Sequence, residues 1–251
     1  MIFWLLTFLP LLHSPTIDTP PDPPSQDSQK VPLPYSSEER HEWEWTQEGI
    51  PVGKTTVLLI APEPEQDHWG LDARLRWSRQ GRSLDLRQRT DFSPDSLEPI
   101  RTRKEGRISA LGVGDRRLVV ATEISNHEAR IVVQSPDEGT QIDRRLPFPA
   151  GSVVLENQSF EHWILIAAQL ARKKKAASPG SHIFSALIPS EYRTLKLELT
   201  FDRQEKSGSQ TLLRWNVKST DFSAKIWISP EGTLERYQQD SVQIRRIVSK
   251  K

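Results

Sequence analysis

The sequence predicts a mainly β protein: a large, curved antiparallel meander sheet, or half-barrel, with one amphipathic helix packed on its concave face. From about residue 40, apolar and polar residues alternate with a period of two, which is the period of a half-buried strand. One long stretch, within residues 146–170, instead has the period of a helix. Short turns rather than crossover helices separate the alternating segments, so about a dozen strands form a meander.

The first strands show the alternation clearly. Trp43 and Trp45 share one face of residues 40–47, and glutamates occupy the other face. The next hairpin turns at RQGR, and pairing Ser78 with Ser83 aligns apolar residues with one another across the two strands. On the polar face this register gives two opposite-charge pairs and one like-charge pair, a balance acceptable for a solvated sheet face. These pairs are Arg76 with Asp85, Asp72 with Arg89, and Arg74 with Arg87.

Later segments repeat the pattern and are rich in β-branched residues, as strands are. They are RRLVVATEI, EARIVVQS, TLKLELTFD, TLLRWNVKS and FSAKIWIS. Turn signals such as SPDEG, EKSGSQ and SPEG lie between them. No internal repeat divides the body, so residues 39–251 are predicted to form a single antiparallel β-meander domain.

The helical stretch places a stripe of apolar residues on one face: Phe160, Trp163, Ile164, Ala167 and Leu170 or Ala171. Asn157 or Ser159 is predicted to cap its start, and the basic run 172–175 suits its end. The helix would cover the apolar concave face of a twisted sheet. The stripe suits ordinary core packing, and it also suits the wall of a ligand site.

The N-terminal region predicts export. Residues 2–12 are apolar apart from Thr7 and Pro10, which is too short for a span of about 20 residues but suits a signal peptide. Residues 1–14 are therefore predicted to be a signal peptide or a short anchor, although no basic residue precedes the apolar run. Residues 15–38 hold seven prolines and predict a disordered spacer. The expected location is the periplasm or cell envelope, with retention there if the N-terminal segment is not cleaved.

The composition and the absence of known motifs exclude several classes of function. The 34 Lys and Arg nearly balance the 33 Asp and Glu, so nothing in the charge calls for nucleic acid. The absence of cysteine removes disulfides, thiolate nucleophiles and cysteine zinc sites. None of the six histidines has a partner at metal-ligand spacing, and no nucleophile elbow or phosphate loop is found. We expect no catalytic residue, no metal and no cofactor: His41 and His162 are predicted to be non-catalytic, with His162 partly solvated at the rim of the core.

Three segments carry a family resemblance. They are GIPVG, DFSPDSLEPIRTR, and LPFPAGSVVLENQSFEHWILIAAQL followed by a strand that ends in LIPSE. Over residues 40–240 the chain resembles an uncharacterised group of exported bacterial β-meander proteins, which are domains of unknown function. The resemblance implies a strongly curved antiparallel sheet, similar to the half-barrels of periplasmic lipoprotein carriers. It implies no catalytic residue.

These observations predict a non-enzymatic extracytoplasmic envelope protein that holds an apolar ligand, such as a lipid or acyl chain, in the curved sheet. The residues predicted to contact the ligand are Phe160, Trp163, Ile164, Ala167 and Trp215. Two alternatives stay open: an interaction scaffold with a filled core, which would bind another envelope protein, and a hydrolase whose site the sequence does not reveal.

Overall fold

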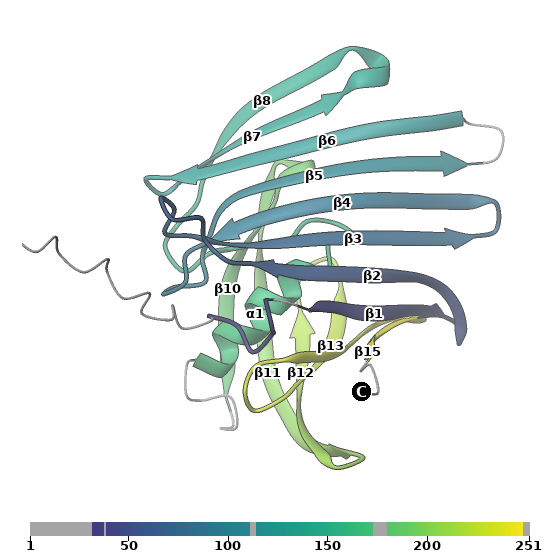
Figure 1. The fold of residues 1–251 in the computed structure, drawn as a ribbon, viewed down its shortest axis with the longest axis vertical. Helices are drawn as coiled ribbons and strands as arrows, with labels where there is room; N and C mark the ends of the chain where they lie inside the picture. Colours follow the sequence, from purple (N-terminus) through teal and green to yellow (C-terminus); the bar gives the residue numbers. More distant parts are fainter. Residues whose placement is uncertain (1–31, 38, 111–113, 173–179, 248–251) are drawn as a thin grey trace, which may run out of the picture. The chain divides into compact units, whose positions relative to one another are not determined.

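A computed structural model describes residues 32–37, 39–110, 114–172 and 180–247. The predicted signal peptide, residues 1–14, lies outside the described residues, as do residues 15–31 of the predicted spacer. The described residues contain one 15-stranded sheet and one α-helix (Figure 1). No helix in this part of the chain is both long and apolar enough to cross a membrane.

Along the chain, strands follow one another with a single α-helix and two 3-10 turns between them. The elements are β1 (Arg40–Gln47), β2 (Ile50–Ile60), β3 (Trp69–Arg79), β4 (Arg82–Phe92), β5 (Pro99–Ala110), β6 (Gly114–Ser125), β7 (Glu128–Ser135), the 3-10 turn η1 (Pro136–Glu138), β8 (Thr140–Pro147), β9 (Val153–Val154), α1 (Glu161–Arg172), β10 (Ser181–Ile188), the 3-10 turn η2 (Pro189–Glu191), β11 (Arg193–Ser207), β12 (Gln210–Lys218), β13 (Ser223–Ile228), β14 (Leu234–Gln239) and β15 (Val242–Ile247), all within the described ranges.

The sheet consists of two meanders joined at their first and last strands. Its order is β8-β7-β6-β5-β4-β3-β2-β1-β15-β14-β13-β12-β11-β10-β9. The β1–β15 pairing, which we call the seam, runs from Glu42 opposite Ile247 to Gln47 opposite Val242. Every pair is antiparallel except β9 with β10, so the sheet is mixed. Because β8 and β9 are the two edges and do not pair with each other, the sheet is not closed into a barrel, and the predicted fold class is confirmed.

The hairpin of β3 and β4 has the predicted register, with Ser78 opposite Ser83 and Arg74 opposite Arg87. Asp85 offsets the repulsion between Arg74 and Arg87, because it lies diagonally across from Arg74 and forms an ion pair with it at 2.6 Å. Asp85 also lies 4.0 Å from Arg76, the residue directly opposite it. The outer, polar face of β3 and β4 therefore carries ion pairs between diagonal neighbours as well as between directly opposite residues.

α1 is buried on every side. All residues from Glu161 to Leu170 are buried, including those opposite the predicted apolar stripe. Figure 1 shows the cause: α1 lies between the wall of β1–β4 and the strands β10–β13, so the curved sheet surrounds it. Its remaining face is also apolar, through Leu165, Ile166 and Ala168, which are 0–4% exposed. A helix that is apolar nearly all round is one that is enclosed.

The predicted caps bind elsewhere. The Ser159 hydroxyl donates to Gln88, and the Asn157 amide donates to Glu191 at 2.6 Å. Both side chains therefore fasten the segment before α1 to neighbouring elements of the sheet.

The main core combines the inner face of both meanders with α1. Trp43, on β1, is fully buried at the seam, and its indole N–H donates to the Leu234 carbonyl at 3.1 Å. Leu33 and Tyr35 belong to this core too, and the Tyr35 hydroxyl accepts a bond from the Leu234 N–H at 2.8 Å. The end of the predicted spacer, residues 32–37, thus packs on the sheet because it carries these two large apolar side chains.

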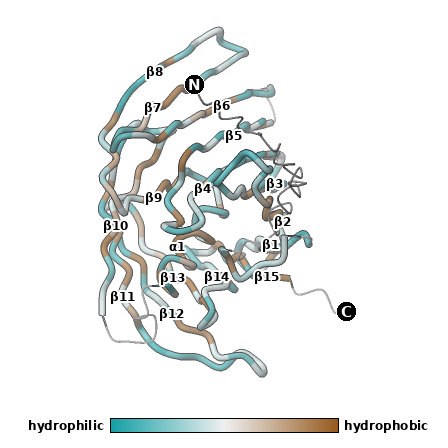
Figure 2. The backbone as a smooth tube through the Cα atoms, turned by 60° about the vertical axis from the view of Figure 1, so that its left-hand side comes forward, coloured by the Kyte–Doolittle hydropathy of each residue, from teal (hydrophilic) through white to brown (hydrophobic). Residues whose placement is uncertain are grey.

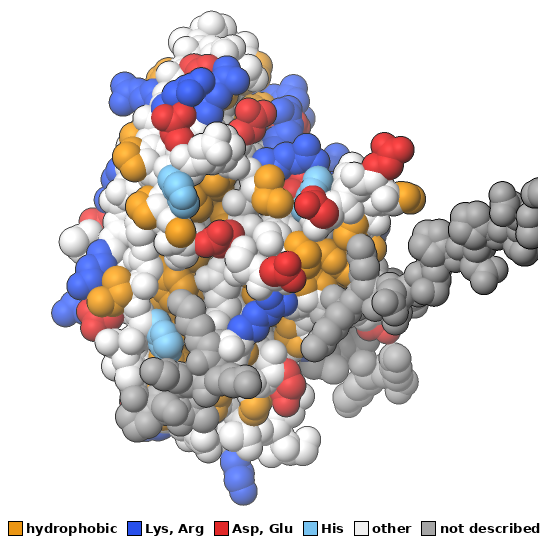
Figure 3. All heavy atoms as spheres, turned by 90° about the vertical axis from the view of Figure 1, so that its left-hand side faces the viewer, with side chains coloured by type: hydrophobic (Ala, Val, Ile, Leu, Met, Phe, Trp, Pro, Cys, Tyr) orange, Lys and Arg blue, Asp and Glu red, His pale blue; other side chains and the backbone are white. Residues whose placement is uncertain are grey.

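The outer surfaces are mainly polar. Figure 2 shows hydropathy changing from residue to residue along the strands, as alternation requires, and β8 is exposed along nearly its whole length. On the face drawn in Figure 3, hydrophobic side chains form several patches with acidic and basic side chains between them.

Candidate functional site

Two adjoining cavities on the inner face form the groove, a candidate ligand site. The first, of about 420 Å³, lies beside the segment that leads into α1, and the second, of about 390 Å³, lies over β3–β5. Four residues line both: Trp45, Gln47, Gln158 and Val242. Each volume is within the roughly 300–1,000 Å³ that is usual for small-molecule sites.

Aromatic rings build the wall of the first cavity. Trp163 of α1 lies 5.2 Å from Tyr237 and 6.4 Å from Phe222, measured between ring centroids. Phe160 lies 6.3 Å from Trp45. Such edge and tilted ring contacts are favourable and hold each ring in place. The first cavity therefore has a preformed aromatic wall.

The second cavity is almost entirely apolar. Leu75, Trp77, Leu84 and Ile108 come from three neighbouring strands and share the inner face because the pleat alternates. Ile108 is 46% exposed, so this part of the groove opens to solvent. Arg82 is the charged residue of its lining.

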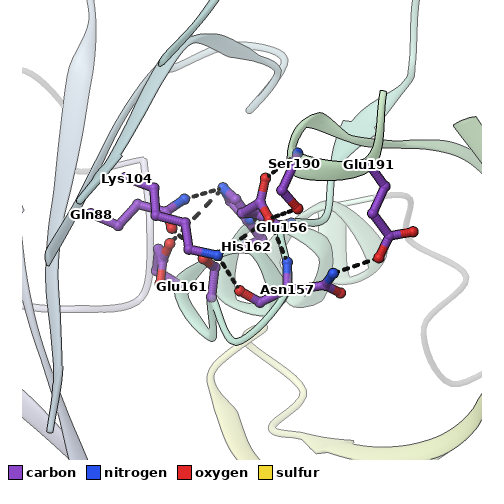
Figure 4. A network of polar contacts seen from close by, with 9 residues as sticks. Gln88, Lys104, Glu156, Asn157, Glu161, His162, Ser190 and Glu191 are labelled. Atoms are coloured by element: carbon purple, nitrogen blue, oxygen red, sulfur yellow. Dashed lines mark hydrogen bonds and ion pairs between the residues drawn. The ribbon is translucent and has the colours of Figure 1, made fainter. Parts of the chain in front are cut away.

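A buried polar cluster holds the first cavity's wall in place (Figure 4). Glu156, which is 4% exposed, accepts bonds from Lys104 at 3.2 Å and from the Ser190 N–H at 2.9 Å. Lys104 also donates to the Asn157 carbonyl at 2.6 Å. One ion pair therefore ties β5, the segment before α1, and η2 together, and its buried charges are compensated as buried charges must be.

His162 is buried rather than partly solvated as predicted, and it is neutral and fully engaged in this cluster. Its Nδ1 accepts the Glu156 N–H at 3.1 Å, and its Nε2 lies 2.8 Å from the Gln88 amide nitrogen and 3.3 Å from the Thr90 hydroxyl. Burial, and then the nearby charge of Lys104, lower the pKa of His162 to about 3. An imidazole with that pKa is a poor proton acceptor at neutral pH.

Glu161, the first residue of α1, is the cluster's unsatisfied member. It is 1% exposed, and among the described residues its Oε1 has no hydrogen-bond partner. Burial raises the pKa of Glu161 to about 7, against smaller opposing effects that include the charge of Lys104. Its Oε1 is 4.0 Å from His162 Nε2, too far for a hydrogen bond.

The chemistry available here is limited. Ser159 lines the groove, but its hydroxyl donates to Gln88 rather than to His162. Across the described ranges, no group of three or more His, Asp or Glu is placed to hold a metal ion. The cluster therefore stabilises and orients the entry to α1.

The residues predicted to contact a ligand divide into two sets. Phe160 and Trp163 line the groove. Ile164, Ala167 and Trp215 are 0–1% exposed and pack in the core away from it. Sequence reasoning missed Trp45 and Val242 at its centre, although the alternation of residues 40–47 had placed Trp45 on the apolar face.

Other sequence features have structural places. His41 Nε2 bonds the Ser36 carbonyl at 3.0 Å, close to where the chain enters β1. Arg172, at the end of α1, donates to the Pro94 and Asp95 carbonyls at 2.8 and 2.7 Å. The other residues of the basic run, 173–175, lie outside the described residues.

Comparison with known proteins identifies a similar fold. No protein-family model and no curated protein matches this chain. A crystal structure of a β-barrel-like protein of domain of unknown function DUF1849 from Brucella abortus is similar, with a TM-score of 0.55 and 11% sequence identity. The match covers 82% of this chain and 93% of that one. At this identity the likeness shows the fold alone: the chain has a β-barrel-like fold that also occurs in a domain of unknown function.

Proposed function

We propose that this protein is a non-enzymatic extracytoplasmic envelope protein that holds one apolar chain, such as an acyl chain, in the groove. The observation that carries the proposal is that two cavities adjoin, with Trp45, Gln47, Gln158 and Val242 lining both. Burial of methylene groups against such walls contributes about 0.8 kcal/mol each. The apolar residues 2–12 and the proline-rich segment after them support the extracytoplasmic location.

A hydrolase is the weaker alternative. The imidazole closest to the groove, that of His162, has both nitrogens engaged and a pKa of about 3. Ser159 is 3% exposed and bonded to Gln88. These two residues lack the nucleophile–base contact that covalent catalysis needs, which favours binding over turnover.

A matched pair of variants tests the groove. Ile108, which lines it, is 46% exposed, and Ile142, on β8 and outside both cavities, is 44% exposed. Ile108→Asp places a charge against an apolar ligand and should raise the Kd for uncharged 1-decanol about tenfold, measured by titration calorimetry. Ile142→Asp should leave it unchanged.

Native mass spectrometry of protein purified from its own host provides the second measurement. A co-purifying lipid that is retained by Ile142→Asp and lost by Ile108→Asp supports the proposal. Absence of decanol binding in the unmodified protein, together with absence of any co-purifying lipid, rejects it and leaves the scaffold.

A further inference from the structure

We propose that the ligand is a single-chain amphiphile with a carboxylate head, and that Arg82 binds this head while the chain lies in the groove. The inference rests on the proposed function and adds the chemistry of the ligand. It starts from the charged residues that line the two cavities of the groove.

Arg82 lies on the inner face. It is opposite Arg79 across the β3–β4 pair and one pleat beyond Leu84, which lines the groove. Inner positions recur every second residue, so Arg82, Leu84 and Leu86 share that face. Most of the other arginines of β3–β5 occupy outer positions, among the ion pairs of the outer face.

Arg82 has no counter-charge within the described part of the chain. Its neighbour Arg79 pairs with Glu48 at 2.6 Å, whereas no carboxylate makes an ion pair with Arg82. One uncompensated guanidinium at the rim of an apolar cavity matches one anionic group at the end of an apolar chain.

The opposite side of the groove sets the orientation. The first cavity is lined by two acidic residues, Glu156 and Asp240. Glu156 is already bonded to Lys104 and Ser190, and Asp240 lies in the β14–β15 turn at the rim. An anionic head is repelled by Asp240 and attracted by Arg82, so the head lies over β3–β5 and the chain runs past Trp45 toward Phe160 and Trp163.

The test compares three ten-carbon ligands that differ in head charge, using the full chain. Titration calorimetry at low ionic strength should give affinities in the order decanoate, 1-decanol, decylammonium. Arg82→Gln should weaken decanoate binding about twofold to fivefold, the range of an exposed ion pair, and leave 1-decanol unchanged. Arg82→Lys should retain most of the decanoate affinity.

Arg87→Gln is the matched control, since it removes the same charge from the same strand on the outer face, where Arg87 lies opposite Arg74. It should leave all three affinities unchanged. Added salt should weaken decanoate binding in the unmodified protein and not in Arg82→Gln.

The outcomes separate the two proposals. Binding of all three ligands without preference, a preference for decylammonium, or equal losses in Arg82→Gln and Arg87→Gln would overturn the role of Arg82 and leave the apolar groove intact. Failure of all three to bind the unmodified protein would overturn the proposed function itself.

Discussion

Glu161 and His162 are adjacent residues whose pKa values move in opposite directions when the protein folds. Burial raises that of Glu161 from 4.5 to about 7, and burial followed by the charge of Lys104 lowers that of His162 from 6.5 to about 3. Between about pH 4.5 and 6.5 the unfolded chain holds the proton on the imidazole and the folded chain holds it on the carboxyl. The two contributions to the pH dependence of stability therefore nearly cancel in this window.

Single substitutions should expose each contribution. The stability due to Glu161 is present below pH 4.5 and is lost as pH rises to 7, so Glu161→Gln should gain stability relative to the unmodified protein over that interval. The stability due to His162 is present above pH 6.5 and is lost as pH falls toward 3, so His162→Gln should gain it in that direction. Each slope should approach about 1.4 kcal/mol per pH unit. Urea unfolding across pH 4–8 measures both, and parallel curves for the two variants would contradict the assignment.

Gly232 occupies a position where both the backbone conformation and the space available require glycine. Its φ is +97°, and a Cβ there would lie 2.8 Å from the Cβ of Ala171 and 3.2 Å from the Cα of Ala168, so the β13–β14 turn touches the backbone of α1. Gly232→Ala should destabilise the protein by about 2 kcal/mol or more, from backbone strain and overlap together. Gly49→Ala, at φ +78° in open space, carries the backbone cost alone and should lose about 1–2 kcal/mol. Equal losses in thermal unfolding would show that the contact with α1 does not matter.

At the scale of the element, α1 allows a comparison between Trp163, which lines the groove, and Ile166, which is enclosed in the core. Ile166 is 0% exposed, whereas Trp163 is 6% exposed and lines the cavity. Ile166→Ala should cost about 2–5 kcal/mol and leave decanol binding unchanged. Trp163→Ala should cost less than the roughly 3–5 kcal/mol of a fully enclosed ring and should weaken decanol binding. Denaturant unfolding and calorimetry on both variants give the comparison, and a larger loss at Trp163 with intact binding would identify it as core.

Sequence patterns predict the elements better than their surroundings. Alternation places Ser78 opposite Ser83 because a hairpin's register depends on a short turn and on local pairing. The apolar stripe locates α1, and the Leu165, Ile166 and Ala168 side of the same stretch is a signal of burial all round. Trp215 was expected at a ligand and lies in the core, because alternation shows which face is apolar without showing what covers it.

At the scale of the whole sheet, the seam carries the connection between the two meanders. No local sequence signal predicts that β1 pairs with β15, since the pairing joins segments from opposite ends of the body. The groove depends on it, because Trp45 of β1 lies opposite Ile244 of β15, and both line the first cavity. A site assembled in this way follows from the topology of the whole sheet and from no single motif.

Ending the chain at Asp240 tests the seam. The truncation removes β15, so β1 and β14 each lose one pairing partner and become edge strands. Unpaired strand edges promote association between chains. We expect loss of the monomer in sedimentation velocity and loss of decanol binding. Ending the chain at Ile247 keeps β15 and should change neither. If the protein that ends at Asp240 were monomeric with an unaltered melting temperature, the two meanders would hold together without the seam.

The seam also has a consequence during biosynthesis. Trp43 and Leu234, which hydrogen-bond across it, are 191 residues apart in the chain. At about 5–20 residues per second, a ribosome needs roughly 10–40 s to make the intervening chain. For that time β1 has left the ribosome while its partner has not been translated, and one of its backbone edges can bind whatever extended segment it meets. A chaperone that holds the nascent chain extended until translation ends would protect this strand, and transport across a membrane in the unfolded state would require the same delay.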